Sequence, residues 1–400
     1  MKVVFITPVT PYKENIGGPS GHPYHLMKER PGGMEITIYS YNQNGFSADT
    51  IAEVEKELDV KIRLLEKPKW IAWLLKLHLT FLRLFLKYPI NYYYRLPKET
   101  VADIEKMEPD LVWVYSQEFS GILKQFRAFQ RLHMVPDCYS LHFYRRLTLR
   151  STMTSKMEYW RIMTNYRKHY RMEQEYDAGE NIAYHLVGEA DRNFLLKINP
   201  KLNAHFIRHP RYELAEPQKK IGFAEPKVKL LIAGRYDFYM KEKADEMIEA
   251  LSQAQQFALR ENFAFTFLGK GWEGHVKTLK EAGYEVVHIV FAPDYVEEVR
   301  KHDIQITPIA IGTGTKGKVL DAIANGLLVI GTEYALENIA VEDGVSCLQY
   351  NTKEELLALL ADIPRNREHY EEMAERGRQA VLKEHDREKV AQEVFELVKG

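Results

Sequence analysis

Cysteines and long apolar stretches are both scarce in this chain of 400 residues. Its two cysteines, Cys138 and Cys347, lie in apolar runs that resemble strands, which argues against a disulfide framework and for a reducing compartment. No apolar stretch of about 18 residues is free of charge, so no membrane-spanning helix is predicted. The N-terminal segment MKVVFITPVT is too short and too rich in β-branched residues for a secretory signal. We therefore expect a cytoplasmic protein, and attachment to the inner face of the cell membrane stays open.

Several functional motifs are also missing. The sequence has no repeat with a period of about 20–50 residues, and no GxGxxG motif that would indicate a dinucleotide site. Asp, Glu and His residues do not cluster with the spacing of a metal site, so no metal and no other cofactor is expected. A nucleic-acid partner is not expected either, because no recognition motif supports one.

The composition is that of a globular protein, with 45% hydrophobic and 28% charged residues. A chain of 400 residues can form two domains with full cores. The net charge of −1 conceals an asymmetry, because Lys and Arg outnumber Asp and Glu by seven in residues 1–210 and are outnumbered by eight in residues 211–400. We therefore expect the N-terminal half to face an acidic surface.

Short β-branched runs alternate with segments of helical length. The predicted strands are Lys2–Ile6, Glu35–Ser40, Leu111–Ser116, Cys138–His142, Ile182–Gly188 and Ala204–His209, then Lys229–Gly234, Phe263–Gly269, Val286–Phe291, Ile304–Pro308 and Leu327–Gly331. Apolar strands that alternate with helices indicate parallel sheets covered on both faces. The pattern restarts after HPRYELAEPQKKIGFAEP (209–226), which is typical of a linker. We predict an α/β fold with two doubly wound, Rossmann-like domains facing a cleft, residues 1–212 and 225–385. Residues 386–400 are predicted to form a C-terminal helix, for which a return to the N-terminal domain is one option.

Two turns of the second domain place cations where a helix dipole disfavours them. In LLIAGRYDFYMKEKADEM (230–247), Arg235 follows the end of a strand, and Lys241 and Lys243 stand at a helix start. Cations there oppose the dipole by about 0.3–1 kcal/mol. An anion such as a phosphate would reverse that effect, because guanidinium and ammonium groups bind phosphate oxygens. Merely solvated lysines are the alternative.

The segment GTGTKGKVLDAIANG (312–326) repeats this arrangement. Its glycines let backbone amides turn inward, and Lys316 and Lys318 again precede or begin a helix. Asp321 lies about one turn into that helix, where a carboxylate can accept hydrogen bonds from paired hydroxyls such as those of a ribose. An ordinary charged helix start is the alternative, but two such turns in one domain indicate a shared diphosphate ligand. In the first domain, Gly17 and Gly18 follow the first strand and would either approach a ligand or form a flexible loop.

These segments resemble those of a known family. GTGTKGKVLDAIANGLLVIGT is similar to the glycine-rich, basic segment of glycosyltransferase family 4, and LLIAGRYDFYMK is similar to its Gly-Arg…Lys phosphate motif. EYDAGENIAYHLVGEADRNFL (175–195) and CYSLHFYRR (138–146) resemble its strand and helix before the hinge and its strand ending in a cleft histidine. The resemblance covers almost the whole chain and implies the GT-B fold and a retaining transfer from a nucleoside-diphosphate sugar without a metal.

The resemblance also implies roles for individual residues. Arg235 and Lys241 would bind the donor diphosphate and, with His142 near the transferred sugar, take part in catalysis; a purely structural histidine is the alternative. Asp321 would hold the ribose. The remaining implied donor contacts are Gly17, Gly18, Phe291 next to the base, Gly312, Thr313, Gly314, Thr315, Lys316 and Lys318. The chain departs from the family where Thr313 replaces a glutamate, Asp321 replaces a second glutamate and Leu328 replaces a proline.

The expected donor is a UDP-sugar or a GDP-sugar, and the expected acceptor is a glycan or a lipid-linked molecule, as in bacterial surface polysaccharide synthesis. Two alternatives remain, a non-catalytic sugar-nucleotide-binding subunit and a sugar-nucleotide epimerase. In KPKWIAWLLKLHLTFLRLFLKY (67–88), a continuous helix would align Lys69, Lys76, Arg83 and Lys87 in one stripe with apolar residues around it. Such a helix either lies on an anionic membrane surface or is buried in the N-terminal domain.

Overall fold

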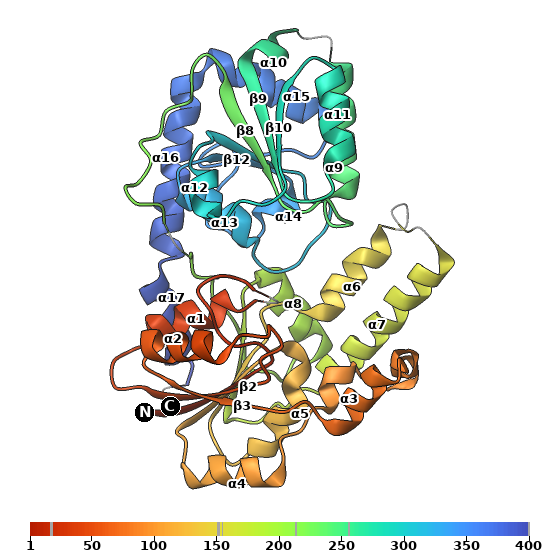
Figure 1. Cartoon of the computed structure of the whole chain (residues 1–400), viewed down its shortest axis with the longest axis vertical. Helices are drawn as coiled ribbons and strands as arrows, with labels where there is room; N and C mark the ends of the chain where they lie inside the picture. The colour runs from red at the N-terminus through yellow and green to blue at the C-terminus, as the bar shows by residue number, and fades with distance from the viewer. Residues whose placement is uncertain (17–18, 150–152, 154, 213, 255–256, 399–400) are drawn as a thin grey trace. The chain divides into compact units, whose positions relative to one another are not determined.

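The computed structural model describes residues 1–400 except 17–18, 150–152, 154, 213, 255–256 and 399–400. The chain forms two compact units, one made of Met1–Pro210 with Arg387–Gly400 and the other of Arg211–Asp386 (Figure 1). Most of the segment predicted as a linker therefore belongs to the second unit, where Phe223 is buried and the backbone amide of Ala215 donates to the side chain of Asn325 over 2.8 Å.

The first unit is built on a parallel sheet of seven strands in the order β3-β2-β1-β4-β5-β6-β7. The strands are β1 (Lys2–Thr7), β2 (Glu35–Ser40), β3 (Lys61–Leu64), β4 (Leu111–Tyr115), β5 (Arg131–Met134), β6 (Ile182–Leu186) and β7 (Ala204–Phe206). Every residue of β4 and β6 is buried, because helices cover both faces of the sheet. The strands that follow β1, namely β2 and β3, lie on one side of it, and β4 lies on the other side. A topological switch point therefore lies between β1 and β4.

The helices of this unit include long α-helices and short 3₁₀ turns. They are α1 (Gly21–Lys28), α2 (Ala48–Leu58), α3 (Lys69–Lys76), η1 (Thr80–Phe85), η2 (Ile90–Tyr93), α4 (Lys98–Lys106), η3 (Gln117–Phe119), α5 (Ser120–Leu123), η4 (Lys124–Phe126), α6 (Tyr139–Thr148), α7 (Lys156–Gln174), α8 (Glu189–Ile198) and α17 (Arg387–Glu396). The C-terminal helix α17 packs against α1, and the ring of Phe395 meets the buried Trp113 of β4 edge-on at 5.4 Å. The last helix thus contributes to the core of the first unit.

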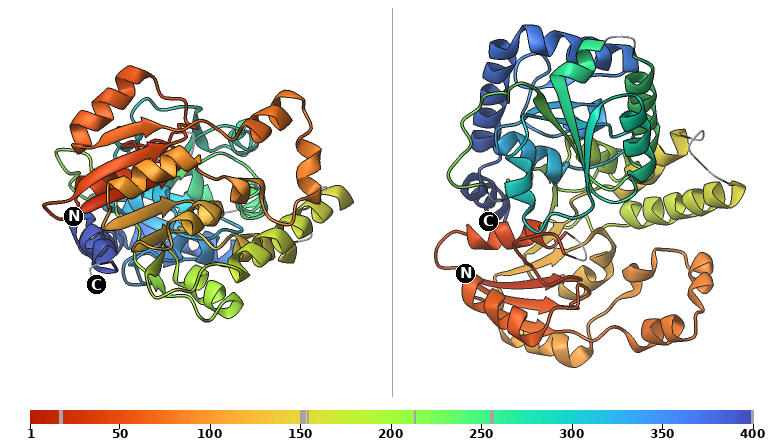
Figure 2. Two further views of the ribbon diagram at one scale, coloured as in Figure 1. Left: turned by 90° about the horizontal axis from the view of Figure 1, so that it is seen from below. Right: turned by 45° about the horizontal axis from the view of Figure 1, so that its top comes forward.

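The second unit has a parallel sheet of six strands in the order β10-β9-β8-β11-β12-β13. Its strands are β8 (Val228–Ala233), β9 (Phe263–Leu268), β10 (Glu285–Ile289), β11 (Ile304–Thr307), β12 (Leu328–Gly331) and β13 (Leu348–Gln349). Its helices are α9 (Lys241–Gln253), α10 (Phe257–Asn262), α11 (Glu273–Glu281), α12 (Tyr295–Val299), α13 (Gly317–Ala324), α14 (Glu333–Leu336), α15 (Lys353–Asp362), η6 (Ile363–Arg365) and α16 (Arg367–Glu384). Figure 2 shows these helices on both faces of the sheet. The switch point of this sheet lies between β8 and β11.

The predicted strand Cys138–His142 is wrong. The strand in this part of the sheet is β5, and residues 139–148 form α6. The start of α6 is capped by carboxylates from distant segments: Asp191 accepts a hydrogen bond from the amide of Cys138 over 2.8 Å, and Glu173 accepts one from the amide of Ser140 over 3.2 Å. These caps satisfy amides that a helix leaves unpaired at its N-terminus. Both cysteines are buried free thiols.

The predicted continuous helix over residues 67–88 is also wrong. The segment breaks after α3 at His78, whose φ of 55° lies in the left-handed region, and continues as the 3₁₀ turn η1. The four cations predicted to share one stripe therefore do not lie on one helix. Burial within the unit is excluded for most of the segment, because only Ile71 of α3 joins the core, whereas Trp73 and Phe85 are 64% and 82% exposed. Among the described residues, no helix combines the length and the apolar character that crossing a bilayer requires.

Candidate active site

The carboxyl ends of β8 and β11 carry the two cation-rich turns of the second unit. In open parallel sheets, ligands bind beyond the carboxyl ends of the strands at the switch point, which here lies between these two strands. The turns touch each other, because the amide of Ala310 donates a hydrogen bond of 2.7 Å to the carbonyl of Tyr239. The topology thus brings Arg235 and the segment 312–316 to the same edge of the sheet.

The turn after β8 depends on close packing of two glycines. Gly234 and Gly269, which follow β8 and β9, have φ of 139° and 138°. A Cβ on Gly269 would lie 2.2 Å from the carbonyl oxygen of Gly234, so only glycine fits. The same carbonyl accepts a hydrogen bond of 2.8 Å from the buried indole of Trp272. This packing fixes the point from which Arg235 leaves the sheet.

The side chain of Arg235 is exposed and makes no hydrogen bond or ion pair with any residue that the structure describes. Burial raises the pKa of the nearby Asp237, and the charge of Arg235 partly offsets this rise. Lys241 differs, because its ammonium donates to Asp245 over 3.1 Å and to the hydroxyl of Tyr236 over 3.2 Å. Lys243 is also paired, with Glu246 over 2.7 Å. The two cations at the start of α9 therefore have acidic partners within the helix, whereas the guanidinium of Arg235 has no hydrogen-bond or ion-pair partner in the described part of the chain.

The turn after β11 is closed by its own lysine. Lys316 donates to the carbonyls of Thr313 and Gly314 over 2.9 and 3.0 Å, and Asn338 donates to the carbonyl of Gly314 over 3.0 Å. Gly314 has φ of 61°, as this tight turn requires. A Cβ on Gly312 would lie 2.5 Å from the Cε of Lys316. The lysine thus shapes the turn, and Thr315 lies partly buried beside it.

Asp321 lies in the second turn of α13, and its carboxylate accepts no hydrogen bond from a described residue. Burial raises the pKa of Asp321 to about 7, and the positive charge of Lys318 opposes that rise. The hydroxyl of Tyr295, at the start of α12, is buried without a hydrogen-bond partner in the described part of the chain, and the charge of Asp321 contributes to the raised pKa of this phenol. The ammonium of Lys318 lies 5.2 Å from the centre of the Tyr295 ring.

Tyr295 is not predicted from the sequence. Nothing in FAPDYVEEV marks this tyrosine, because its proximity to Asp321 arises from the packing of α12 near α13. Phe291, the residue predicted near the base, is 76% exposed just beyond β10, on the segment that leads to Tyr295. Carboxylate, phenol and ammonium together form a polar cluster with hydrogen-bonding capacity left for a ligand.

The candidates from the first unit are less informative. His142 lies in the first turn of α6, partly buried, and not at a strand end as predicted. Its ring packs against Phe143, with centroids 5.1 Å apart. Gly17 and Gly18 lie outside the described residues. Within the described part of the chain, no three His, Cys, Asp or Glu side chains come together as a metal site.

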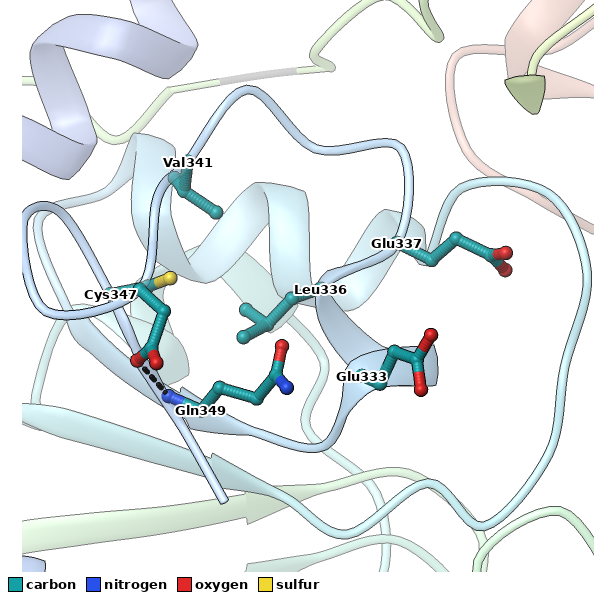
Figure 3. Close-up of a pocket in the computed structure, with 7 residues that line it drawn as sticks. Glu333, Leu336, Glu337, Val341, Cys347 and Gln349 are labelled. Atoms are coloured by element: carbon teal, nitrogen blue, oxygen red, sulfur yellow. Dashed lines mark hydrogen bonds between the residues drawn. The ribbon is translucent and has the colours of Figure 1, made fainter. Parts of the chain in front are cut away.

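A pocket of about 190 Å³ lies elsewhere in the second unit, between α14 and β13 (Figure 3). Its polar lining is mainly acidic, with Glu333, Glu337 and Asp343 around Leu336 and Cys347. Acidic side chains repel phosphates. This pocket is therefore a poorer anion site than the edge where Arg235 lies.

Comparison with known proteins identifies the architecture. Residues 242–396 match the family model described as "Glycosyl transferase-like". The structure is similar to that of Anabaena HepE in complex with UDP, with 12% identity over 99% of both chains and a TM-score of 0.62. It is also similar to sucrose-phosphate synthase from Thermosynechococcus elongatus, with 12% identity over 99% of this chain and 98% of the other and a TM-score of 0.67. The fold is GT-B.

WaaG, a glycosyltransferase involved in lipopolysaccharide biosynthesis, shares the GT-B fold with 15% identity over 99% of this chain and all of its own, and a TM-score of 0.61. No curated protein has a significantly similar sequence. The family match and the GT-B fold together support a GT-B glycosyltransferase. The match includes the turn after β11 and Asp321 but begins after Arg235.

Proposed function

We propose that the protein is a retaining glycosyltransferase of family 4 that moves a hexose from a nucleoside-diphosphate sugar to a glycan or lipid-linked acceptor. The observation that carries this proposal is the pair of groups at the β8–β11 switch point: the guanidinium of Arg235 and the carboxylate of Asp321, neither hydrogen-bonded to a described side chain. A nucleoside diphosphate has the complementary groups, a diphosphate for the cation and ribose hydroxyls for the carboxylate.

The chemistry requires stabilisation of the negative charge that develops on the departing diphosphate. Arg235 can form two parallel hydrogen bonds with phosphate oxygens, and the amides at Gly312–Thr315 add donors without a net charge. Preorganised donors of this kind are worth about 10²–10³ each in turnover. We propose that these groups act without a divalent metal, and that Asp321 and Tyr295 hold the ribose.

UDP is the nucleotide that we favour, with GDP next, and the HepE complex with UDP supports this order. The role of WaaG in lipopolysaccharide biosynthesis supports an acceptor in bacterial surface glycoconjugates. Thr313, which stands where family 4 has a glutamate, favours a second candidate, a non-catalytic subunit that binds the sugar nucleotide for a partner enzyme. The two candidates agree on the donor and differ in turnover.

The test is a thermal-shift screen of the full chain against nucleoside-diphosphate sugars, with and without EDTA. A ligand at ten times its Kd adds about 1.4 kcal/mol of stability, which raises the Tm of a unit of this size by about 3–6 °C. Stabilisation by a UDP- or GDP-sugar that survives EDTA supports the donor site and its metal independence. No shift with any nucleotide sugar at millimolar concentration would refute the proposal.

Turnover separates the two candidate functions. Slow hydrolysis of the stabilising donor, or its transfer to an acceptor extract, indicates the enzyme. Tight donor binding with neither reaction indicates the subunit. The configuration of the released sugar, determined by NMR, tests the retaining mechanism, because inversion would exclude it.

A further inference from the structure

The segment from α3 to η1 exposes an unusual amount of apolar surface. Seven of the 17 large hydrophobic side chains that are exposed in the described chain fall between residues 70 and 85. They are Trp70, Trp73, Leu77, Phe81, Leu82, Leu84 and Phe85. Apolar side chains exposed together on one short segment indicate a binding surface, whereas isolated exposed hydrophobic residues need no explanation. We call residues 69–85 the α3–η1 surface.

This surface is positively charged. Between Lys67 and Tyr88 the chain has five basic residues and no acidic one. Lys69, Lys76 and Arg83 are exposed, and their side chains form no hydrogen bond or ion pair with a described residue. These three cations have no partner among the described residues and belong to the same segment as the exposed tryptophan and phenylalanine side chains. Such a surface fits a partner that is both anionic and apolar. Anionic phospholipid at a membrane interface combines these properties.

The α3–η1 surface is attached to the folded unit at several points. Ile71 is buried in the core, and the ammonium of Lys168 in α7 donates to the carbonyl of Arg83. Lys87, the fourth predicted membrane cation, forms an ion pair of 3.0 Å with Glu175 and is thus already paired within the protein. The contact between Lys168 and Arg83 places η1 next to α7, and the exposed Arg167 and Arg171 of α7 add two further cations near Lys168 in the sequence.

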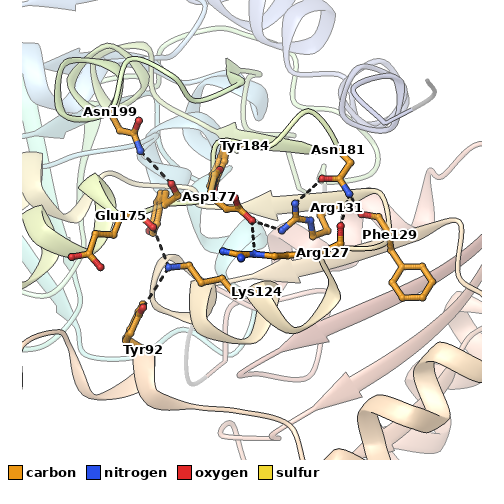
Figure 4. A network of polar contacts seen from close by, with 11 residues as sticks. Tyr92, Lys124, Arg127, Phe129, Arg131, Glu175, Asp177, Asn181, Tyr184 and Asn199 are labelled. Carbon is orange, nitrogen blue, oxygen red and sulfur yellow. Dashed lines mark hydrogen bonds and ion pairs between the residues drawn. The ribbon is translucent and has the colours of Figure 1, made fainter.

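A polar network around the buried Arg131 holds the end of α7 in place (Figure 4). The backbone carbonyl of Glu175 accepts from Lys124 over 3.1 Å, and Asp177 pairs with the buried Arg131 over 2.7 Å. Arg131 also donates to Asn181 over 2.7 Å. Glu175 links this network to Lys87, just after η1. The backbone that carries the exposed aromatic side chains is therefore fixed to the folded unit, and little backbone ordering is needed on binding.

We propose that the α3–η1 surface docks the protein on an anionic lipid bilayer, with Trp73, Phe81 and Phe85 in the interface and Lys69, Lys76 and Arg83 against the headgroups. The inference goes beyond the proposed function, because membrane binding requires neither the donor nor turnover. It would bring the enzyme to acceptors carried by lipids.

The experiment is co-sedimentation of the full chain with vesicles of phosphatidylcholine containing 30% phosphatidylglycerol and with vesicles of phosphatidylcholine alone. We expect binding to the anionic vesicles, weakened when the salt concentration rises from 0.1 to 0.5 M. The triple variant Trp73→Ser, Phe81→Ser, Phe85→Ser should lower the partition coefficient at least tenfold. Neutralisation by Lys69→Gln, Lys76→Gln and Arg83→Gln should lower it roughly fivefold per charge on anionic vesicles.

Matched controls lie in the second unit. Val287→Ser with Val345→Ser removes two side chains that are 50% and 43% exposed, and Lys270→Gln with Lys280→Gln removes two exposed charges. Both control variants should bind vesicles as the parent does, and circular dichroism should show that all variants fold.

The proposal is overturned if the parent does not bind anionic vesicles, or if the aromatic variant binds as tightly as the parent. Light scattering of the parent and the aromatic variant tests self-association. A parent that forms a dimer and does not bind vesicles, together with a monomeric aromatic variant, would assign the surface to a second copy of the chain instead.

Discussion

The two cation-rich turns of the second unit look alike in sequence and differ in structure. Both follow a strand at the switch point, contain glycine and place a lysine at a helix start. After β11, Lys316 is bound to the carbonyls of its own turn, so its charge shapes the backbone. After β8, Lys241 is bound to Asp245, whereas Arg235 has no partner among the described residues.

The difference shows that a cation in such a turn has three uses, namely closing the turn, pairing within the following helix and binding a ligand. The helix dipole disfavours Lys241 and Lys316 alike, and all three cations lie in or just after glycine-containing turns that follow a strand, so placement in the sequence alone does not separate their uses. The hydrogen-bonding state of each side chain does. The predictions below test this distinction, because only the unpaired groups should dominate donor binding and turnover.

The largest effect is expected at Arg235. Arg235→Ala should lower kcat/KM at least about a hundredfold, because an oriented donor to the departing diphosphate is lost. Arg235→Lys should recover part of the activity, because it restores the charge without the bidentate geometry. Steady-state kinetics with the donor selected by thermal shift provides the measurement.

The control for Arg235 is Arg365→Ala, since Arg365 is another exposed arginine of the second unit without a hydrogen bond to a described residue. It should retain the activity and the Tm of the parent. Similar kinetic constants for Arg235→Ala and Arg365→Ala would show that Arg235 has no special role in donor binding or turnover.

The next effect is a pH dependence set by Asp321. Its carboxyl group has a pKa raised to about 7 by burial, and only the ionised form offers both oxygens as acceptors to a pair of ribose hydroxyls. Below pH 7 the group is mostly protonated, so donor affinity should fall as the pH falls, by about tenfold between pH 8 and pH 6 if only the ionised form binds. Calorimetry with a nucleotide sugar measures this change, because its diphosphate, unlike the terminal phosphate of free UDP, has no ionisation in this range.

Asp321→Asn should bind the donor weakly at both pH values and lose the pH dependence. The same substitution should stabilise the unliganded protein at pH 8. A carboxyl group whose pKa is raised on folding contributes stability at low pH and loses that contribution as the pH rises through about 7. A variant that keeps the slope of the parent would show that another group controls the pH profile.

The fold was largely predictable because its strands are local signals. β2 (Glu35–Ser40) has the predicted bounds, and the other correct strands begin and end within a few residues of the predicted ones. β5 was missed because Arg131 and His133 interrupt its apolar pattern, although both side chains are buried in the structure. The helix at residues 139–148 was mistaken for a strand because its caps, Glu173 and Asp191, come from segments that the local pattern does not connect to it.

The candidate site was predictable in part for a similar reason. Arg235 and Asp321 lie a few residues along the chain from strand ends and glycines, so their positions in the fold follow from the local sequence. The partners of Lys241 and Lys316 depend on rotamers and turn geometry, and the approach of Tyr295 to Asp321 depends on the placement of α12 near α13. Membrane cations were predicted on one continuous helix, but the break at His78 and the ion pair of Lys87 depend on tertiary contacts.

A smaller effect is expected from disturbing the turn after β11. Gly312→Ala would place a Cβ 2.5 Å from the Cε of Lys316 and displace the lysine from the carbonyls of Thr313 and Gly314. Because the lysine is a flexible side chain, we expect donor affinity to fall about three- to tenfold, the value of one or two weakened hydrogen bonds, with little change in Tm. Gly317→Ala is the matched control, because a Cβ there meets nothing within 4 Å and alanine favours the start of α13. Equal affinities for the two variants would show that Lys316 does not shape the site.

The smallest effect is expected at Lys241, although the family resemblance implies the same role for it as for Arg235. Its side chain is 51% exposed, and its ammonium is paired with Asp245, four residues along the same helix. Because the ammonium is engaged within the helix, Lys241→Ala should lower kcat/KM no more than about threefold. Loss of such a surface pair should cost about 0–1 kcal/mol of folding stability, as in the control Lys353→Ala, which breaks the exposed pair with Glu249. A hundredfold loss at Lys241 would mean that the donor draws this lysine away from Asp245. In that case Asp245→Asn, which frees the ammonium beforehand, should tighten donor binding, whereas a lysine that only pairs within the helix leaves donor binding unchanged.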